Sequence, residues 1–339
     1  MGAEGFLVTR LPNVRYLTGF TGSNGQVLLT ADGGLFLTDG RYAEQSRHEV
    51  PDLHRGIYTG QFPPVFEKAC ADLNVRRVAF EAAGVTHQSY LDMAATGAEM
   101  IPTQGEVERL RWVKEPEEIE LLDRAQAIAD ESFRAVLDLL REGISERMVA
   151  FELELSMRRA GADGPAFDTI VAFGPSAAEP HHRPTARELR PHDLVKLDFG
   201  CLVDGYHSDM TRTVAFGDPP AELREVYEVV RSAQQAGIDA VRAGVSGAVA
   251  DRAAREVIVE AGYGDRYTHS LGHGVGLEVH EGPNLRAGGT DVLPPAAVVT
   301  VEPGIYLPGQ GGVRIEDMVE VLEDGCRVIP RVARELLVV

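Results

Sequence analysis

Two hydrophobic β segments, each with two acidic residues placed symmetrically about a turn, constrain this 339-residue chain most strongly. Asp198 and Asp209 flank an Asp-Gly turn, and Glu302 and Glu316 flank a glycine-rich turn. If each hairpin folds about its midpoint, the two acids of a pair face each other with Cβ atoms about 5 Å apart. Because like charges opposed across strands are destabilising, the pattern requires a counter-charge.

Divalent cations would supply that counter-charge, because four carboxylates balance the charge of two such ions. The midpoint of the first hairpin is expected between Val203 and Asp204, and that of the second at Gly309. A histidine would complete a mixed nitrogen and oxygen ligand set suited to Mn, Co, Fe or Zn. For any single acid the alternative is a solvent-facing position on an exposed strand. We expect this for Asp317, which points to the opposite face from Glu316.

The candidate histidine is His273, in a glycine-rich segment that also contains His269 and His280, so that three of the ten histidines fall within twelve positions. The alternating glycines do not match a phosphate-binding fingerprint, because Leu277 interrupts them and no Lys-Ser/Thr follows. Glycine allows the backbone to approach a metal site or a substrate closely. We therefore expect a site here, and the alternative is a structural role for each histidine.

Secondary-structure patterns predict a small α/β domain over residues 1–107 and a larger α+β domain over residues 108–339, with helices on one face of a mainly antiparallel sheet. Pro116 suits the first turn of a helix that opens the larger domain. Strands are expected at 6–8, 27–30, 35–38, 77–80, 168–173, 193–200, 207–216, 297–306, 312–322 and 326–338. Helices are expected near 41–49 and 64–73, from 116 to Gly143, and at 145–160, 221–242 and 248–261.

Composition narrows the classes of partner. The 52 acidic and 33 basic residues give a formal net charge of -19, which argues against nucleic acid and anionic membranes as partners. The three cysteines are far apart and form no CxxC spacing, so neither a disulfide framework nor a thiolate zinc site is expected. We find no signal-peptide run and no stretch of about 18 apolar residues that would span a membrane. A cytoplasmic protein is the expectation.

The sequence around these residues resembles the pita-bread metallopeptidase family. The five expected ligands follow the order D–D–H–E–E of that family and are Asp198, Asp209, His273, Glu302 and Glu316. The last four of these residues stand in the segments Ser-Asp-Met-Thr-Arg-Thr, Gly-His-Gly-Val-Gly-Leu-Glu-Val-His-Glu, Val-Glu-Pro-Gly-Ile-Tyr and Arg-Ile-Glu-Asp. The resemblance implies that these five side chains bind two metal ions.

The resemblance extends to both parts of the chain. Residues 13–20 and 38–42 are similar to the creatinase-type N-terminal domain, which accompanies Xaa-Pro aminopeptidases and prolidases and is absent from methionine aminopeptidases. The resemblance implies a creatinase-type domain over residues 1–107 and a pita-bread catalytic domain over residues 108–339.

The resemblance also implies roles for individual side chains. Glu302 would be both a ligand and the proton acceptor, and His280 would contact the reacting carbonyl. His181 lies 17 residues before Asp198, as the substrate-binding histidine of the family does, and the adjacent His182 is the alternative for that role.

Two further residues match positions that line the proline side of the pocket in the family. These are His269 and Arg314, although Arg314 is equally well explained as a counter-charge for the carboxylates. Thr211, two residues after Asp209, is expected to orient a carboxylate through its hydroxyl.

The implied reaction is metal-assisted hydrolysis of the bond before proline, in which two divalent ions lower the pKa of a shared water. Manganese is the expected metal, and cobalt and zinc are the alternatives. We expect an Xaa-Pro aminopeptidase that acts on proline-containing peptides and forms a homodimer. The alternatives are a prolidase restricted to dipeptides and a non-catalytic pita-bread scaffold for protein interaction. A non-haem iron oxidoreductase would usually use two histidines and one carboxylate instead.

Overall fold

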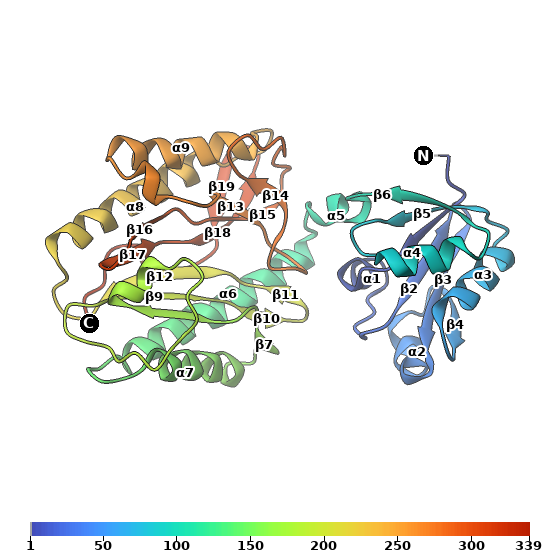
Figure 1. The fold of residues 1–339 in the computed structure, drawn as a ribbon, viewed down its shortest axis with the longest axis horizontal. Helices are drawn as coiled ribbons and strands as arrows, with labels where there is room; N and C mark the ends of the chain where they lie inside the picture. Colours follow the sequence, from blue (N-terminus) through green and yellow to red (C-terminus); the bar gives the residue numbers. More distant parts are fainter. Residues whose placement is uncertain (1) are drawn as a thin grey trace. The chain divides into compact units, whose positions relative to one another are not determined.

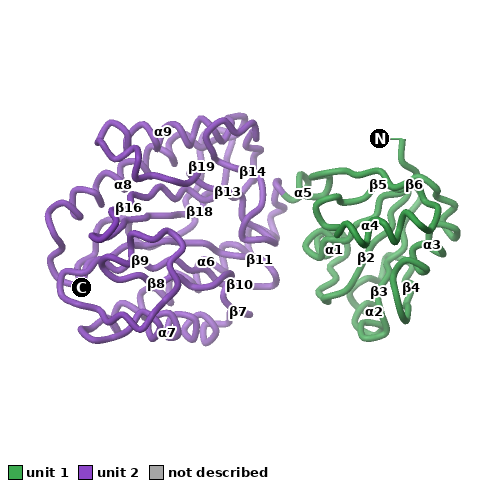
Figure 2. The backbone as a smooth tube through the Cα atoms, viewed as in Figure 1, with its two compact units in different colours: residues 1–111 green, residues 112–339 purple. Residues whose placement is uncertain are grey.

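The computed structural model describes residues 2–339, which form two compact units that divide between Arg111 and Trp112 (Figure 2). Each unit has its own hydrophobic cores. The domain boundary expected after residue 107 lies within α5 (Glu106–Arg111), the last helix of the first unit.

The first unit contains a six-stranded sheet of order β4-β3-β2-β1-β5-β6, which is antiparallel at its centre and parallel at its edges. Its strands are β1 (Gly5–Val8), β2 (Gln26–Thr30), β3 (Gly33–Asp39), β4 (His54–Tyr58), β5 (Arg77–Glu81) and β6 (Glu99–Thr103). Its other helices are α1 (Leu11–Thr18), α2 (Gln45–Glu49), α3 (Phe62–Asp72) and α4 (His87–Ala94). The sequence analysis missed β4 and β6 because these edge strands are half exposed and carry no continuous apolar run.

The second unit has two pairs of helices with β-strands between them (Figure 1). The helices are α6 (Pro116–Leu137), α7 (Glu146–Arg159), α8 (Ala221–Ala240) and α9 (Gly247–Glu260). The strands of the first half are β7 (Gly164–Pro165), β8 (Ile170–Phe173), β9 (Leu194–Phe199), β10 (Cys201–Val203), β11 (Tyr206–His207) and β12 (Met210–Ala215). Those of the second half are β13 (Gly272–Gly274), β14 (Glu281–Leu285), β15 (Val298–Val301), β16 (Gly304–Leu307), β17 (Gly311–Arg314), β18 (Asp317–Leu322) and β19 (Gly325–Val328).

The two halves of this unit repeat one plan. In each half, two helices precede a strand that pairs antiparallel with the first strand of an acid-bearing hairpin, β8 with β9 and β13 with β15. This arrangement confirms the predicted α+β class. The strand expected over 326–338 ends at β19, because Pro330 follows shortly afterwards and cannot donate to a ladder. No helix in residues 2–339 is long and apolar enough to cross a membrane.

Two of the helix starts expected from the sequence are confirmed by their caps. Pro116 opens α6, and the backbone N–H of Glu115 donates to the Glu118 carboxylate at 2.9 Å. The hydroxyl of Ser145 accepts from the backbone N–H of Met148 at 3.3 Å at the start of α7. These caps satisfy N–H groups that the first turn of a helix leaves unpaired.

The first acid-bearing hairpin has a different register from the one expected. Strands β9 and β12 pair so that Asp198 lies opposite Thr211 and not opposite Asp209. The tip residues Asp204 and Gly205 have φ angles of 46° and 78°, both in the left-handed region that a two-residue type I′ turn requires. The midpoint therefore lies between these two residues, and the predicted pairing of the two aspartates was wrong. Asp209 lies in the interruption just before β12.

The second acid-bearing hairpin folds as expected. Val301 of β15 pairs with Asp317 of β18, and the same register resumes in β16 and β17. Glu302 and Glu316 therefore face each other across an interruption between the two strand pairs. The predicted midpoint at Gly309 is confirmed.

Asp317 is fully buried, so the expectation that it faces solvent was wrong. Its carboxylate accepts hydrogen bonds from Arg212 at 2.6 Å and from Gln234 of α8 at 2.8 Å. The Arg212 guanidinium also donates to the backbone carbonyls of Thr211 and Glu316. The buried ion pair of Arg212 with Asp317 therefore joins the two hairpins, and the hydrogen bond from Gln234 links α8 to them.

We expect Arg212→Met to lower the free energy of unfolding by about 3–5 kcal/mol, because it leaves the Asp317 charge buried without its closest ion-pair partner. Denaturant titration followed by circular dichroism measures this change. Arg231→Met, at a partly exposed arginine of α8 paired with Glu228, is the matched control and should cost less than about 1 kcal/mol. A similar, small loss in both variants would contradict a stabilising role for the buried pair.

Candidate active site

The second unit contains a cavity of about 690 Å³. Its walls come from segments that are far apart in the sequence, including both acid-bearing hairpins and the glycine-rich segment. The cavity is lined by every site residue expected from the sequence: His181, Asp198, Asp209, His269, His273, His280, Glu302, Arg314 and Glu316. The fold therefore brings all of these side chains to one place.

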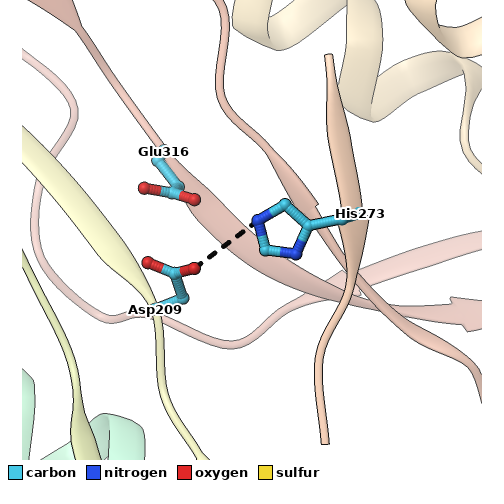
Figure 3. Close-up of side chains that lie close together, drawn as sticks. All are labelled: Asp209, His273 and Glu316. Atoms are coloured by element: carbon cyan, nitrogen blue, oxygen red, sulfur yellow. Dashed lines mark ion pairs between the residues drawn. The ribbon is translucent and has the colours of Figure 1, made fainter. Parts of the chain in front are cut away.

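Three of the expected ligands form a compact group. Ligand atoms of Asp209, His273 and Glu316 all lie within 4.8 Å of one another, and Figure 3 shows the three side chains pointing toward a common point. The Nε2 atom of His273 lies 3.7 Å from Asp209 Oδ2 and 3.4 Å from Glu302 Oε1. Atoms that bind one ion at about 2 Å each are separated by about 3–4 Å, so these spacings suit a shared cation.

Two of the carboxylates that line the cavity, Asp209 and Glu316, resist ionisation in the absence of a bound cation. Burial raises the pKa of Asp209 well above its usual range, and the nearby Glu316 and Asp198 add to this effect. Burial, with Glu302 and Asp198, likewise raises the pKa of Glu316. The Thr211 hydroxyl donates to Glu316 Oε2 at 2.7 Å, as expected for a residue that orients a carboxylate. This buried set of hard oxygen donors and one imidazole fits divalent cations.

Glu302 differs from the other acids because it lies beside a histidine. Burial alone would raise the pKa of Glu302, but the hydrogen bond and charge of His273, together with the charges of His269 and Arg314, outweigh burial and lower this pKa to about 2. Burial would lower the pKa of His273, but Glu302 raises it instead. The Thr300 hydroxyl lies between the two, accepting from the His273 backbone N–H at 3.1 Å and donating to Glu302 Oε1 at 3.4 Å.

The glycines on either side of His273 are required by neighbouring strands. A Cβ atom on Gly272 would lie 2.0 Å from the carbonyl oxygen of Thr300, and one on Gly274 would lie 2.1 Å from the carbonyl oxygen of Gly282. The close approach expected of these glycines is therefore to the adjacent backbone and not to a metal or a substrate.

Arg314 is buried in the cavity wall with its guanidinium fully engaged. It forms an ion pair with Asp198, and its Nε donates to Thr211 Oγ1 at 3.0 Å. Its Nη1 donates to the Tyr306 hydroxyl at 3.0 Å and to the Pro180 carbonyl at 3.2 Å. This geometry supports the alternative in which Arg314 is a counter-charge for the carboxylates.

Tyr306 and Lys196 are polar groups of this region that the sequence analysis did not identify. The Tyr306 hydroxyl joins Arg314 to His269, whose Nε2 lies 2.9 Å away. The buried Lys196 ammonium lies over the Tyr306 ring, 5.2 Å from its centre. Tyr306 is four residues after Glu302 in the same segment, so the alternation of side chains along a strand could have indicated it.

The two adjacent histidines of the loop before β9 differ in burial. His182 is buried, and its two ring nitrogens pair with Glu146 at 2.9 Å and Glu179 at 2.8 Å. His181 is exposed and lines the cavity. Both histidines line the cavity, but only His182 is anchored by buried contacts, whereas the ring of His181 is exposed there.

Comparison with known proteins agrees with this geometry. Residues 120–323 match the model of metallopeptidase family M24, and residues 1–113 match that of the creatinase/prolidase N-terminal domain. The uncharacterised peptidase YqhT of Bacillus subtilis (strain 168) is 43% identical over 340 residues, covering 100% of this chain and 96% of that protein.

Solved structures of two relatives superpose on the whole chain. The Xaa-Pro dipeptidase from Bacillus anthracis has 41% identity and a TM-score of 0.97, with coverage of 100% of this chain and 96% of that one. The X-Pro aminopeptidase from Thermotoga maritima MSB8 has 37% identity and a TM-score of 0.92, with coverage of 100% and 98%. These matches confirm the predicted fold of both parts of the chain, which belongs to metallopeptidase family M24.

Proposed function

We propose that this protein hydrolyses the bond between an N-terminal residue and a following proline, using two divalent metal ions. The ions would be held by Asp198, Asp209, His273, Glu302 and Glu316, with manganese as the expected metal and cobalt or zinc as alternatives. The observation that carries the proposal is the clustering of Asp209, His273 and Glu316 inside the cavity. Divalent ions bound there would supply a nucleophile at neutral pH and polarise the scissile carbonyl.

Glu302 is the proposed proton acceptor. In the metal-free protein its pKa of about 2 keeps the carboxylate ionised at neutral pH, the form that both a metal ligand and a proton acceptor require. It would then pass the proton to the leaving proline nitrogen, which has no hydrogen of its own in the peptide bond.

His280 is the proposed donor to the carbonyl oxygen as charge develops on it. Its ring lies 4.2 Å from that of His273, at the ligand cluster. Burial lowers the pKa of His280, and the neighbouring His273 lowers it further. A neutral imidazole still has one N–H to donate, and one such donor is typically worth about 3 kcal/mol in the transition state.

The remaining cavity residues would position the substrate. His181 would hold the peptide from the loop before β9, and His269 with Arg314 would line the proline pocket. Burial lowers the pKa of His269, so its imidazole is neutral and can form a wall for an apolar pyrrolidine ring. A pocket that offers no partner to a backbone N–H would select proline at this position.

Peptide length separates two candidate activities. The sequence analysis favours an aminopeptidase, which accepts longer peptides, whereas a relative that matches the whole chain is named an Xaa-Pro dipeptidase and another an X-Pro aminopeptidase. The proposal therefore specifies cleavage of the Xaa-Pro bond, and it covers both dipeptides and longer peptides. A cytoplasmic location and a homodimer remain predictions.

We expect the manganese-loaded protein to release alanine from Ala-Pro or Ala-Pro-Ala but not from Ala-Ala-Ala. Chromatography of the products after incubation with each peptide measures this preference. Cleavage of both proline peptides would establish an aminopeptidase, and cleavage of Ala-Pro alone would establish a dipeptidase. Equal cleavage of Ala-Ala-Ala would contradict proline selection, and no cleavage of any peptide would favour the non-catalytic scaffold.

A further inference from the structure

We propose that Arg183 binds the C-terminal carboxylate of an Xaa-Pro dipeptide and thereby gives the site a preference for dipeptides over longer peptides. This inference rests on the proposed function and adds a specificity-determining residue to it. Arg183 lines the cavity two residues after His181, on the same loop.

The first observation is that Arg183 has the one permanent positive charge available for a ligand among the described residues that line the cavity. The other arginine in the lining is Arg314, whose guanidinium is occupied by Asp198, Thr211 and Tyr306. Arg183 is exposed, and within residues 2–339 its guanidinium forms no hydrogen bond or ion pair.

The second observation is that the loop around Arg183 is anchored from the protein interior. The fully buried Glu146 carboxylate pairs with His182 at 2.9 Å and accepts from the Thr185 backbone N–H at 2.9 Å and hydroxyl at 2.6 Å. The buried Lys196 ammonium donates to carbonyl oxygens at the start of the loop, the closest at 2.6 Å. These contacts on both sides fix the backbone of Arg183 while its side chain remains exposed.

The third consideration is the charge that an Xaa-Pro dipeptide brings into the cavity. Its free carboxylate belongs to the residue immediately after the bond to be cleaved, so it must enter the cavity that contains the acidic ligands. A guanidinium can pair with this carboxylate through two parallel hydrogen bonds. In a longer peptide the same position is a neutral amide, to which a guanidinium contributes much less. Arg183 would therefore discriminate between substrates by their charge at this position.

The test compares the dipeptide Ala-Pro with its neutral amide, Ala-Pro-NH₂, using the metal-loaded protein and the variant Arg183→Ala. We expect the variant to lower kcat/KM for Ala-Pro by about 10-fold to 100-fold, chiefly through a higher KM, and to leave kcat/KM for the amide unchanged. Arg183→Lys retains the charge and should lose less of the dipeptide preference than Arg183→Ala. Arg190→Ala, at an exposed arginine nearby that does not line the cavity, is the matched control and should change neither value.

The outcomes separate failure of this inference from failure of the proposed function. If Arg183→Ala lowers kcat/KM equally for Ala-Pro and its amide, or for neither, the assignment of Arg183 is overturned. If the metal-loaded wild-type protein cleaves no Xaa-Pro substrate, the proposed function is overturned and this inference falls with it. Matching melting temperatures for wild type and variant would show that any loss is not due to unfolding.

Discussion

Replacing Glu302 with glutamine is expected to lower kcat for an Xaa-Pro peptide by about 10³-fold. Glutamine has nearly the same shape and keeps one oxygen that can bind a cation, but it cannot accept the proton. In the metal-free wild-type protein, His273 lowers the pKa of Glu302 to about 2, so this carboxylate is ionised throughout the neutral range. The variant lacks this negative charge at every pH. Steady-state kinetics at saturating metal measure the effect.

Two controls make this result specific to proton transfer. Metal content, measured on the same samples, should remain close to that of the wild type, which separates loss of the base from loss of the ions. Glu323→Gln, at an exposed glutamate outside the cavity, makes the same chemical change and should leave kcat unaltered. A Glu302→Gln protein with full metal content and a kcat within about 10-fold of the wild type would show that another group takes the proton.

The stabilisation that divalent metal gives to this protein is expected to increase with pH. In the metal-free fold, burial raises the pKa of both Asp209 and Glu316 above their usual values near 4. Such raised values stabilise the metal-free fold fully below about pH 4, and this contribution is lost as pH rises through the folded-state pKa values. Metal requires the ionised carboxylates, so protons compete with it across the same range and its affinity rises with pH.

Melting temperatures of metal-stripped and manganese-restored protein between pH 5.5 and 8 test this expectation. At a free metal concentration of about 100 times Kd the stabilisation is about 2.7 kcal/mol, which corresponds to a rise of several degrees in Tm. The comparison at each pH cancels the titration of groups that do not contact metal. A difference in Tm that stays constant or shrinks as pH rises would contradict the coupling between these two carboxylates and the cations.

The two hairpins show what sequence reasoning could and could not predict. The register around Gly309 was predicted correctly because the turn is placed symmetrically between the two glutamates. The midpoint of the first hairpin was wrong by one position, which moves the partner of Asp198 by two residues, because Asp204-Gly205 was not placed at the centre of a type I′ turn. The rule that an Asp-Gly pair occupies both central positions of such a turn would have given the observed pairing.

Buried polar contacts were the least predictable part of the site. Asp317 was expected to face solvent because neighbouring strand residues point to opposite faces, but α8 covers the other face and Arg212 pairs with this carboxylate there. Sequence alone does not state that both faces of a strand are covered. The contacts of Lys196 were equally unpredictable. Its Nζ donates to carbonyl oxygens of a loop whose position the sequence pattern does not indicate.

The expected ligands could be recognised because their residue types occur together with the sequence motifs that surround them. The structure places all of them on one cavity, although they come from segments more than 100 positions apart. The sequence analysis chose His181 over the adjacent His182 only by its spacing from Asp198, because adjacent identical residues carry the same chemical information. Burial distinguishes them, since His182 is buried against Glu146 and His181 is exposed, although both line the cavity.

The central claim is that divalent cations held by the acid-bearing hairpins and His273 carry out Xaa-Pro hydrolysis. The most direct measurement is a titration of manganese into chelator-stripped protein, with Ala-Pro and Ala-Pro-Ala cleavage and bound metal recorded on the same samples. We expect no cleavage without metal, and recovery that reaches its plateau as two ions bind per chain. Full cleavage by the stripped protein, or no cleavage by the fully loaded protein, would contradict the claim.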